Sequence, residues 1–255
     1  MIRIDQAVYA EKPLTVDEGF QFGRGVFETI LVLDSPIFWT EHCRRLNRGL
    51  ADLSVRSPVD ADQLLQQILQ LGIRHCVLKV MVSPENIVLL TRPLPVEASD
   101  PLQKLTLQLD PRSNDPRLLR NKTINYLPGL LAWQDAKSCG YDDTLFFSET
   151  RVIRECSRSN VFFICASRIL TPDCSCGLLP GIVRQWVLDR YPVTPGIFQT
   201  SDILSADAVF VTNSVIGIRP ISQIDNRSYI KTMHPLVAEI SSNYQDQVQK
   251  QSIQS

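Results

Sequence analysis

The chain has 255 residues, of which 44% are hydrophobic and 21% are charged. That length suits one large domain or two medium ones, with enough apolar side chains for a sizeable core. A formal net charge of −1 gives no electrostatic basis for binding nucleic acid or an anionic membrane. No apolar run approaches the ~20 residues that span a bilayer, so we expect an enzyme-sized protein without nucleic-acid or membrane partners.

Cysteine and histidine are too dispersed to predict a metal centre. Seven cysteines and three histidines are present, with no CxxC pair, and Cys174 and Cys176 would supply only two ligands. We therefore expect no metal and plain reduced thiols. The first residues, MIRIDQAVYAEKPL, lack a basic-then-apolar signal pattern. These features favour a cytoplasmic protein.

The first part of the chain alternates strand-like and helical patterns. Residues 25–39 predict two strands around a tight turn. Residues 41–53 predict a helix with Thr40 as its N-cap, and residues 58–72 predict a second helix, ending at Gly72. The apolar face expected on the second helix comprises Leu64, Leu65, Ile68 and Leu71. Three strands are expected next, at 76–83, 86–92 and 104–110.

The polar segment 113–122 carries a proline and lacks periodicity, which is typical of a linker. We expect a small N-terminal α+β domain at 1–115, a linker at 116–122, and a larger C-terminal domain at 123–255. The elements expected in that domain are helices at 125–138, 181–191 and from about 234, and strands at 143–148, 151–155, 160–166, 168–172, 195–199 and 207–213. The sheets should be mostly antiparallel, and the polar tail 245–255 should fray.

Lys122 is the first candidate for chemistry, in NKTINYLPGLL (121–131). An amine must lose its proton to attack a carbonyl, and burial and nearby positive charge lower a lysine pKa enough for that. A solvated lysine at the start of a helix is the ordinary alternative.

Glu155 is the second candidate, between a strand and a polar turn in VIRECSRSNVFFI (152–164). Such an acid is either a turn residue or a carboxylate aimed into a pocket, and Asn160 could pin the turn.

Two further stretches could bind an anion. LLPGIVRQWVL (178–188) exposes a helix N-terminus with its N–H groups, and Thr-Asn-Ser (212–214) ends an apolar strand. A loop that enters a helix, and ordinary turn chemistry, would explain these patterns equally well.

Seven motifs, in this order, resemble the fold-type IV pyridoxal-phosphate enzymes. They are HCRRL (42–46), KTINYLPGLLA (122–132), GYDDTLFF (140–147), ECSRSNVF (155–162), LTP (170–172), LLPGIVRQ (178–185) and TNSVIGIRP (212–220). The resemblance runs from about residue 20 to 221. The family contains branched-chain aminotransferases, D-amino acid aminotransferases and 4-amino-4-deoxychorismate lyases. It implies a two-domain α+β fold whose larger domain has an antiparallel barrel-like sheet, a pyridoxal 5'-phosphate cofactor, a small-molecule substrate and a homodimer.

The resemblance also implies a role for each site residue. Lys122 would hold the cofactor covalently, and Glu155 would face the pyridine nitrogen and keep it protonated. Arg45 would bind the cofactor phosphate with its guanidinium fork. The other phosphate contacts would come from the N–H groups of Ile182, Val183 and Val215, and from Ser214. Val183 stands where the family often has threonine, so one hydroxyl contact would be missing.

Three features favour the lyase branch of the family: the form of TNSVIGIRP, the cysteine in Glu155-Cys156, and Thr29 in VFETI. In the lyases a threonine at the position of Thr29 would assist proton transfer. The implied reaction releases pyruvate from aminodeoxychorismate and yields 4-aminobenzoate for folate synthesis. An aminotransferase acting on a D- or branched-chain amino acid is the alternative. A non-catalytic relative is a third possibility, against which the retained lysine, glutamate and arginine argue.

Two departures from the family pattern affect substrate recognition. The stretch MVSPENIVLLTRP (81–93) lacks the arginine and glycine-rich loop expected there, leaving Lys79 or Arg92 as possible substitutes. Arg24 stands where lyases often have aspartate.

Overall fold

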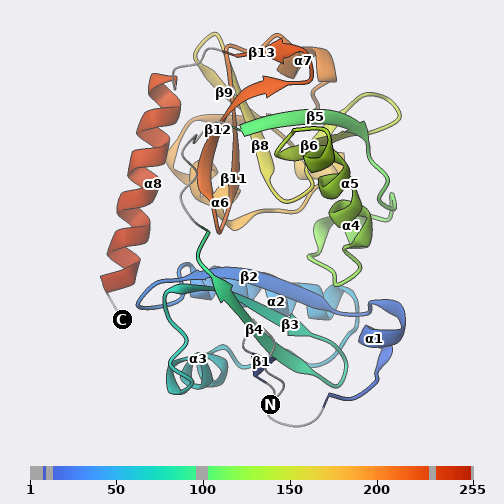
Figure 1. Ribbon diagram of the computed structural model, residues 1–255, viewed down its shortest axis with the longest axis vertical. Helices are drawn as coiled ribbons and strands as arrows, with labels where there is room; N and C mark the ends of the chain where they lie inside the picture. Colours follow the sequence, from blue (N-terminus) through green and yellow to red (C-terminus); the bar gives the residue numbers. More distant parts are fainter. Residues whose placement is uncertain (1–7, 10–13, 96–102, 230–233, 254–255) are drawn as a thin grey trace. The chain divides into compact units, whose positions relative to one another are not determined.

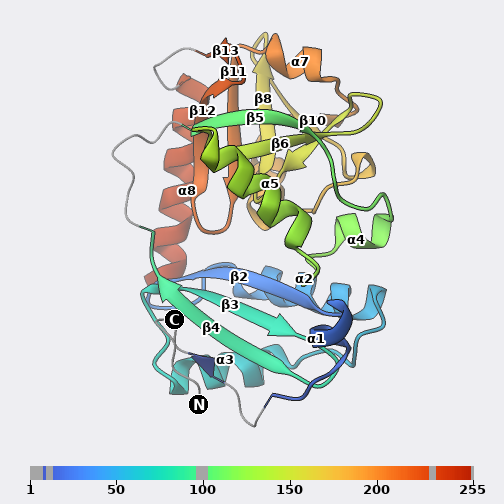
Figure 2. The same cartoon turned by 45° about the vertical axis from the view of Figure 1, so that its right-hand side comes forward.

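The computed structural model describes residues 8–9, 14–95, 103–229 and 234–253 (Figures 1 and 2). It divides into two compact units, and each is described by itself. The first comprises Met1–Val96, Asn121–Asn125 and Gln247–Ser255, and the second comprises Glu97–Arg120 and Tyr126–Asp246. This division differs from the boundaries expected at 115 and 122, because strand β5 (Gln103–Leu109) pairs with strands of the second unit.

The first unit is a two-layer α/β structure. Its elements are β1 (Val8–Tyr9), α1 (Glu18–Phe22), β2 (Val26–Val32), α2 (Trp39–Asp52), α3 (Ala61–Gln70), β3 (Cys76–Val82) and β4 (Ile87–Pro93). The strands form an antiparallel sheet of order β1-β4-β3-β2. Leu46 and Leu50 of α2 and Leu64 and Ile68 of α3 join one core cluster with residues of β2, β3 and β4, so both helices cover the same face of the sheet.

Alternation along β2 assigns its side chains to the two faces of that sheet. Val26, Ile30 and Val32 belong to the core under the helices. Glu28 has the same parity, and it contacts α2. Phe27 and Thr29 therefore lie on the opposite face.

Two details of the expected helices are wrong. Helix α2 begins at Trp39 after Phe38, which has a left-handed φ of 55° and no side-chain cap, so Thr40 is not the N-cap. Leu71, expected on the buried face of the next helix, lies beyond α3 and is 41% exposed.

The second strand expected within 25–39 is reduced to a bridge between Val32 and Pro36.

The second unit is built on a curled, mixed sheet. Its elements are β5, α4 (Pro116–Arg120), α5 (Leu127–Ser138), β6 (Asp143–Phe147), β7 (Ile153–Cys156), β8 (Asn160–Cys165), β9 (Arg168–Pro172), η1 (Cys174–Cys176), α6 (Ile182–Arg190), β10 (Val193–Gly196), α7 (Thr200–Leu204), β11 (Ala208–Asn213), β12 (Gly217–Ile224), β13 (Arg227–Ser228) and the first part of α8 (Pro235–Ile253). The part of α8 from Gln247 onward belongs to the first unit. The described strands follow the order β10-β9-β8-β11-β12-β5-β6-β7, with β13 paired to β12. Strand β7, at one end of this order, also lies against β8 and β9 near the other end, so the sheet curls toward a barrel.

The expected α+β class with a barrel-like sheet is confirmed. The pairs β9–β10, β5–β12 and β5–β6 are parallel, so the sheet is less uniformly antiparallel than expected. The core inside the curl is strongly apolar because Leu145, Ile153 and Phe163 are fully buried there.

The polar end of the chain is helical, so the expectation that it frays is wrong for its described part. Helix α8 continues to Ile253. The Ser35 hydroxyl donates to the carbonyl of Gln251 (3.1 Å), and the Phe38 N–H donates to the Gln251 side chain (2.9 Å). Ser252 is buried and bonds to Asp34. These contacts supply partners that polarity alone does not reveal.

Candidate active site

Lys122 lies on a short extended segment at the edge of β2. The Phe27 N–H donates to the Lys122 carbonyl (2.8 Å), and the Ile124 N–H donates to the Gly25 carbonyl (3.0 Å). A Cβ at Gly25 would come within 2.4 Å of the Ile124 side chain, so glycine permits this close approach. Helix α5 begins only at Leu127. Lys122 is therefore fixed to the sheet by backbone hydrogen bonds and is not a residue at a helix start.

Two lysines gather around one aromatic ring of the first unit. The Nζ of Lys122 lies 4.7 Å from the centroid of the Phe27 ring, and the Nζ of Lys79 lies 4.2 Å from it. Thr29 is directly opposite Lys79 in the β2–β3 pairing and on the same face as Phe27. Burial and the charge of Arg92 lower the pKa of Lys79. Lys122, Thr29 and Lys79 thus form a cationic, partly buried patch on the sheet face away from the helices.

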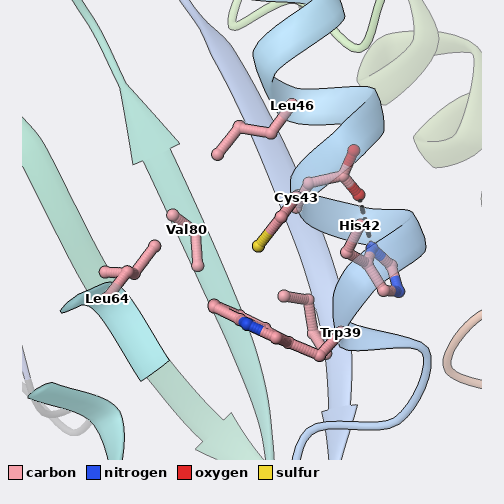
Figure 3. A pocket seen from close by; sticks show the side chains of 8 residues that line it. Trp39, His42, Cys43, Leu46, Leu64 and Val80 are labelled. Atoms are coloured by element: carbon pink, nitrogen blue, oxygen red, sulfur yellow. Dashed lines mark hydrogen bonds and ion pairs between the residues drawn. The ribbon is translucent and has the colours of Figure 1, made fainter. Parts of the chain in front are cut away.

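Arg45 is held on the helix face by Glu28. Its Nε and Nη2 donate to the two oxygens of the Glu28 carboxylate, at 2.8 and 2.6 Å. Nδ1 of His42 lies 2.7 Å from the same carboxylate (Figure 3). Glu28 is 1% exposed, and although burial opposes it, Arg45 and His42 lower its pKa to about 2. The carboxylate is therefore ionised at neutral pH, and it fixes the orientation of the guanidinium.

His42 is neutral in this arrangement. Burial lowers its pKa against the raising effect of Glu28, and the charges of Arg45 and Lys122 lower it further. Its Nε2 is buried with no hydrogen-bond partner among the described residues. The small pocket drawn in Figure 3, beside His42 and lined by Trp39 and Cys43, has no room for a water molecule. Packing accounts for this pocket, and it is not a ligand site.

Glu155 belongs to the second unit, at the end of β7, and is 5% exposed. Nη1 of Arg112 donates to one of its oxygens (2.6 Å). Nε and Nη2 of Arg112 bond to Asp110, which also pairs with Arg154 (2.9 Å). Although burial alone would lower it, the charges of Glu155 and Asp110 and their hydrogen bonds raise the pKa of Arg112. The structure thus places the Glu155 carboxylate in a paired, buried position, as a cofactor-facing acid requires.

Asn160 binds the second oxygen of Glu155. Its amide nitrogen donates to that oxygen (3.1 Å) and to the carbonyl of Leu179 (2.9 Å). Leu179 precedes Gly181, the N-cap of α6, which offers no side chain to the N–H groups of the first turn. Ile182 and Val183, whose N–H groups are expected to bind phosphate, begin this helix and are buried. A helix N-terminus of this kind favours an anion.

The strand end at 212–215 contributes a second polar group near Asn160. Thr212 is opposite Asn160 in the β8–β11 pairing and is 1% exposed. Its hydroxyl has no hydrogen-bond partner among the residues described. Ser214 is half-buried in the following turn. The Val215 N–H, expected to contact phosphate, donates to the Asn213 side chain (2.9 Å), so it would have to share that bond with a ligand.

In chemical type, the residues of each unit match parts of a phosphorylated aldehyde cofactor. In the first unit, the partly buried amine of Lys122 matches its carbonyl. In the second unit, the paired carboxylate matches its ring nitrogen, and the uncapped helix start and the orphaned hydroxyl match its phosphate. The sequence patterns did not point to Glu28 or Arg112, whereas Thr212 lies in the Thr-Asn-Ser stretch that was expected to suit an anion. Glu28 carried a signal, since it is a charged residue at a helix-facing position of an otherwise apolar strand. Arg112 carried none, because it lies in the irregular segment taken as the linker.

Within the described residues, no group of three or more histidine, cysteine or acidic side chains is placed to hold a metal ion. The described helices include none that is both long and apolar enough to cross a membrane.

Sequence comparison identifies the family. The model of the amino-transferase class IV family matches residues 25–224. The chain belongs to that family. Enzymes of the family use pyridoxal phosphate, which agrees with the chemistry of the residues described above.

Individual relatives carry two different activities. An aminodeoxychorismate lyase of Bacillus subtilis is 28% identical over 239 residues, which cover 84% of this chain and 82% of the relative. A D-alanine aminotransferase of Listeria monocytogenes is 27% identical over 236 residues, covering 82% and 81%. A crystal structure from Legionella pneumophila, described as a "Putative 4-amino-4-deoxychorismate lyase", has a TM-score of 0.83 at 25% identity and covers 93% of this chain and 96% of its own. Overall similarity therefore shows the family without separating lyase from aminotransferase.

Proposed function

We propose that this protein is a pyridoxal-phosphate-dependent 4-amino-4-deoxychorismate lyase. The observation that carries the proposal is the grouping of Lys122, Thr29 and Lys79 around Phe27. An eliminating enzyme needs a base and a proton donor on one side of its substrate. Aminodeoxychorismate also carries two carboxylates, which a cationic patch attracts.

The residues would divide the work as follows. Bound cofactor would supply an electron sink for the carbon that loses its proton. Lys122 would hold the cofactor and, once the ring amino group of the substrate displaces it, would take the proton from the amino-bearing carbon. The carbon–oxygen bond to the enolpyruvyl group then breaks, and Lys122 or Thr29 would return a proton to the departing enolpyruvate. The products are pyruvate and 4-aminobenzoate, and formation of the aromatic ring favours them.

The remaining site residues would bind the cofactor. Glu155 would pair with the protonated pyridine nitrogen, and Arg45 would bind the phosphate with its guanidinium oriented by Glu28. The N–H groups of Ile182 and Val183 would bind the same phosphate. Ser214 and the N–H of Val215 would add further contacts. The homodimer that the family resemblance implies, and the cytoplasmic location that the cysteine pattern and the first residues favour, are part of the proposal.

A cofactor-binding test comes first. Purified wild-type protein with pyridoxal phosphate should absorb at about 420 nm, and Lys122→Ala should lose that band because no amine remains to react. Lys137→Ala, an exposed lysine on α5, is the matched control and should keep the band. Indistinguishable spectra of Lys122→Ala and wild type would contradict the central assignment.

An activity test then separates the two candidate reactions. Chorismate, ammonia and an ammonia-dependent aminodeoxychorismate synthase supply the substrate, and 4-aminobenzoate is measured as product. A parallel assay offers D-alanine or a branched-chain amino acid with a keto acid. We expect 4-aminobenzoate, and transamination without it would establish the alternative, which similarity to D-alanine aminotransferase supports.

A further inference from the structure

Asn160 connects Glu155 with the segment before α6. The family resemblance gives these two parts of the second unit separate tasks, since Glu155 would face the pyridine nitrogen and the start of α6 would bind the phosphate. The one amide nitrogen of Asn160 donates to the Glu155 carboxylate (3.1 Å) and to the Leu179 carbonyl (2.9 Å). Asn160 is 5% exposed and begins β8. A primary amide has two N–H donors, so these two acceptors use both.

The other end of the amide fits against the start of α6. A Cβ placed on Gly181 would lie 1.9 Å from Oδ1 of Asn160, so only glycine leaves room for the side chain there. Gly181 is the N-cap of α6, and its φ of −71° is open to any residue, so space and not backbone conformation requires glycine. The Asn160 side chain is therefore closely packed against the helix start as well as bonded to the turn before it.

The backbone around Asn160 is fixed on two sides, by a hydrogen bond in the turn before it and by strand pairing with β11. The N–H of Cys156 donates to the Ser159 carbonyl (2.8 Å) across the turn that joins Glu155 to Asn160. On the other side, Asn160 is paired with Thr212 of β11. A side chain anchored in this way can fix a distance between groups that it contacts.

We propose that Asn160 is a positioning residue that sets the separation between the Glu155 carboxylate and the N-terminus of α6. This inference rests on the proposed function, in which Glu155 pairs with the pyridine nitrogen and the helix start binds the phosphate. A cofactor that engages both groups gains from their being held at the correct separation. A ligand that carries only the ring, or only the phosphate, engages one group, so its affinity depends little on that separation.

Asn160→Leu tests the inference because leucine keeps the branched shape and removes both donors without adding charge. Three ligands are titrated into wild type and variant: pyridoxal phosphate, pyridoxal and inorganic phosphate. We expect affinity for pyridoxal phosphate to fall about 30-fold or more, and affinities for pyridoxal and phosphate to fall less than about threefold. Asn47→Leu is the matched control, since the Asn47 amide donates to the Val59 carbonyl (2.9 Å) in the first unit. It should lower Tm without changing the ratio of the three affinities.

Gly181→Ala approaches the same contact from the other side, because its methyl group would displace the Asn160 amide. It should give the same pattern as Asn160→Leu. Equal losses for all three ligands, unchanged affinity for pyridoxal phosphate, or failure of both variants to fold would overturn the inference. Wild type that binds no pyridoxal phosphate would instead overturn the proposed function, so the two failures are distinguishable.

Discussion

Glu28 in the first unit and Glu155 in the second are both buried glutamates paired with an arginine, yet the pairs have opposite geometry. Glu28 receives two nitrogens along one edge of Arg45. Glu155 receives a single nitrogen of Arg112, whose other edge is bound by Asp110. In the first pair the acid fixes the arginine, whereas in the second an anchored arginine fixes the acid.

Under the proposed function, this difference separates a carboxylate that orients a binding residue from a carboxylate that itself pairs with the cofactor. A bidentate contact restrains a guanidinium strongly, so Glu28 is suited to orient Arg45 toward a phosphate. Around Glu155 the positive charge is shared with a second carboxylate, and the other oxygen meets the neutral amide of Asn160. We therefore expect replacement of Glu155 to affect mainly catalysis, and replacement of Glu28 to affect mainly stability.

The largest effect should follow from Glu155→Gln. Glutamine keeps the size and one oxygen but loses the charge that would stabilise a protonated pyridine. We expect kcat/KM for 4-aminobenzoate formation to fall about 10³-fold, comparable with loss of one key electrostatic contact. Tm should change by only a few degrees. Glu149→Gln, an exposed acid of the same unit, is the control. Activity within threefold of wild type would break the functional half of the comparison.

Glu28→Gln should act on stability. Breaking a buried ion pair while its arginine remains costs roughly 3–5 kcal/mol, so the free energy of unfolding should fall by about 3 kcal/mol at pH 7. Urea unfolding followed by circular dichroism measures this change. Glu41→Gln, an exposed acid on the same helix as Arg45, is the control and should stay within about 0.5 kcal/mol of wild type.

The pH dependence of Glu28→Gln has a definite sign. The folded pKa of Glu28 is about 2, below its ordinary value of 4.5. Its contribution is therefore present above pH 4.5 and is lost as pH falls toward 2. The stability difference between wild type and variant should shrink between pH 5 and pH 3. A constant difference over that range would show that Glu28 is not a paired, ionised group.

A smaller effect should come from Lys79, on the sheet face opposite Glu28. Lys79→Met keeps the apolar stem over Phe27 but removes the charge near Lys122. We expect KM for aminodeoxychorismate to rise about tenfold, or about 1.4 kcal/mol of binding, with kcat changed less than threefold. Lys104→Met, an exposed lysine, is the control. A fall in kcat at constant KM would instead place Lys79 in the proton-transfer step.

Local patterns predicted most of the fold, because apolar periodicity and turn residues define strands and helices directly. They failed where long-range contacts decide the outcome. The tail 245–253 is polar, yet it is helical because Asp34, Ser35 and Phe38 provide partners more than 200 residues away. Thr40 would make a good N-cap, but Phe38 takes a left-handed conformation and starts α2 earlier.

In the candidate site, too, local patterns indicated some residues, and long-range contacts decided the importance of others. Lys122, Glu155 and Arg45 could be named because each lies in a motif of recognisable form. Arg112 could not, because its importance arises only when the fold brings it to Glu155, 43 residues away in the sequence. Asn160 was expected to pin a turn, and the structure shows that it also bonds to the segment before α6.

Asp143 is a third buried acid and marks the limit of the comparison, because its ion pair with Nε of Arg158 is long, at 4.0 Å. Burial raises the pKa of Asp143, against the lowering effects of Arg158 and Ser157. Its contribution to stability is therefore greatest below the unfolded pKa of 3.8 and is lost as pH rises through the folded value, the reverse of Glu28. Asp143→Asn should leave stability at pH 7 within about 1 kcal/mol of wild type, or raise it, because the ion pair that is lost is long and the exposed Arg158 stays hydrated without its partner. Urea unfolding at pH 4 and pH 7 measures how the free energy of unfolding changes with pH in wild type and Asp143→Asn. The exposed Asp135→Asn is the control. Destabilisation above about 2 kcal/mol at pH 7 would show that Asp143 is ion-paired as strongly as Glu28, and that burial with a distant arginine is enough for such a pair.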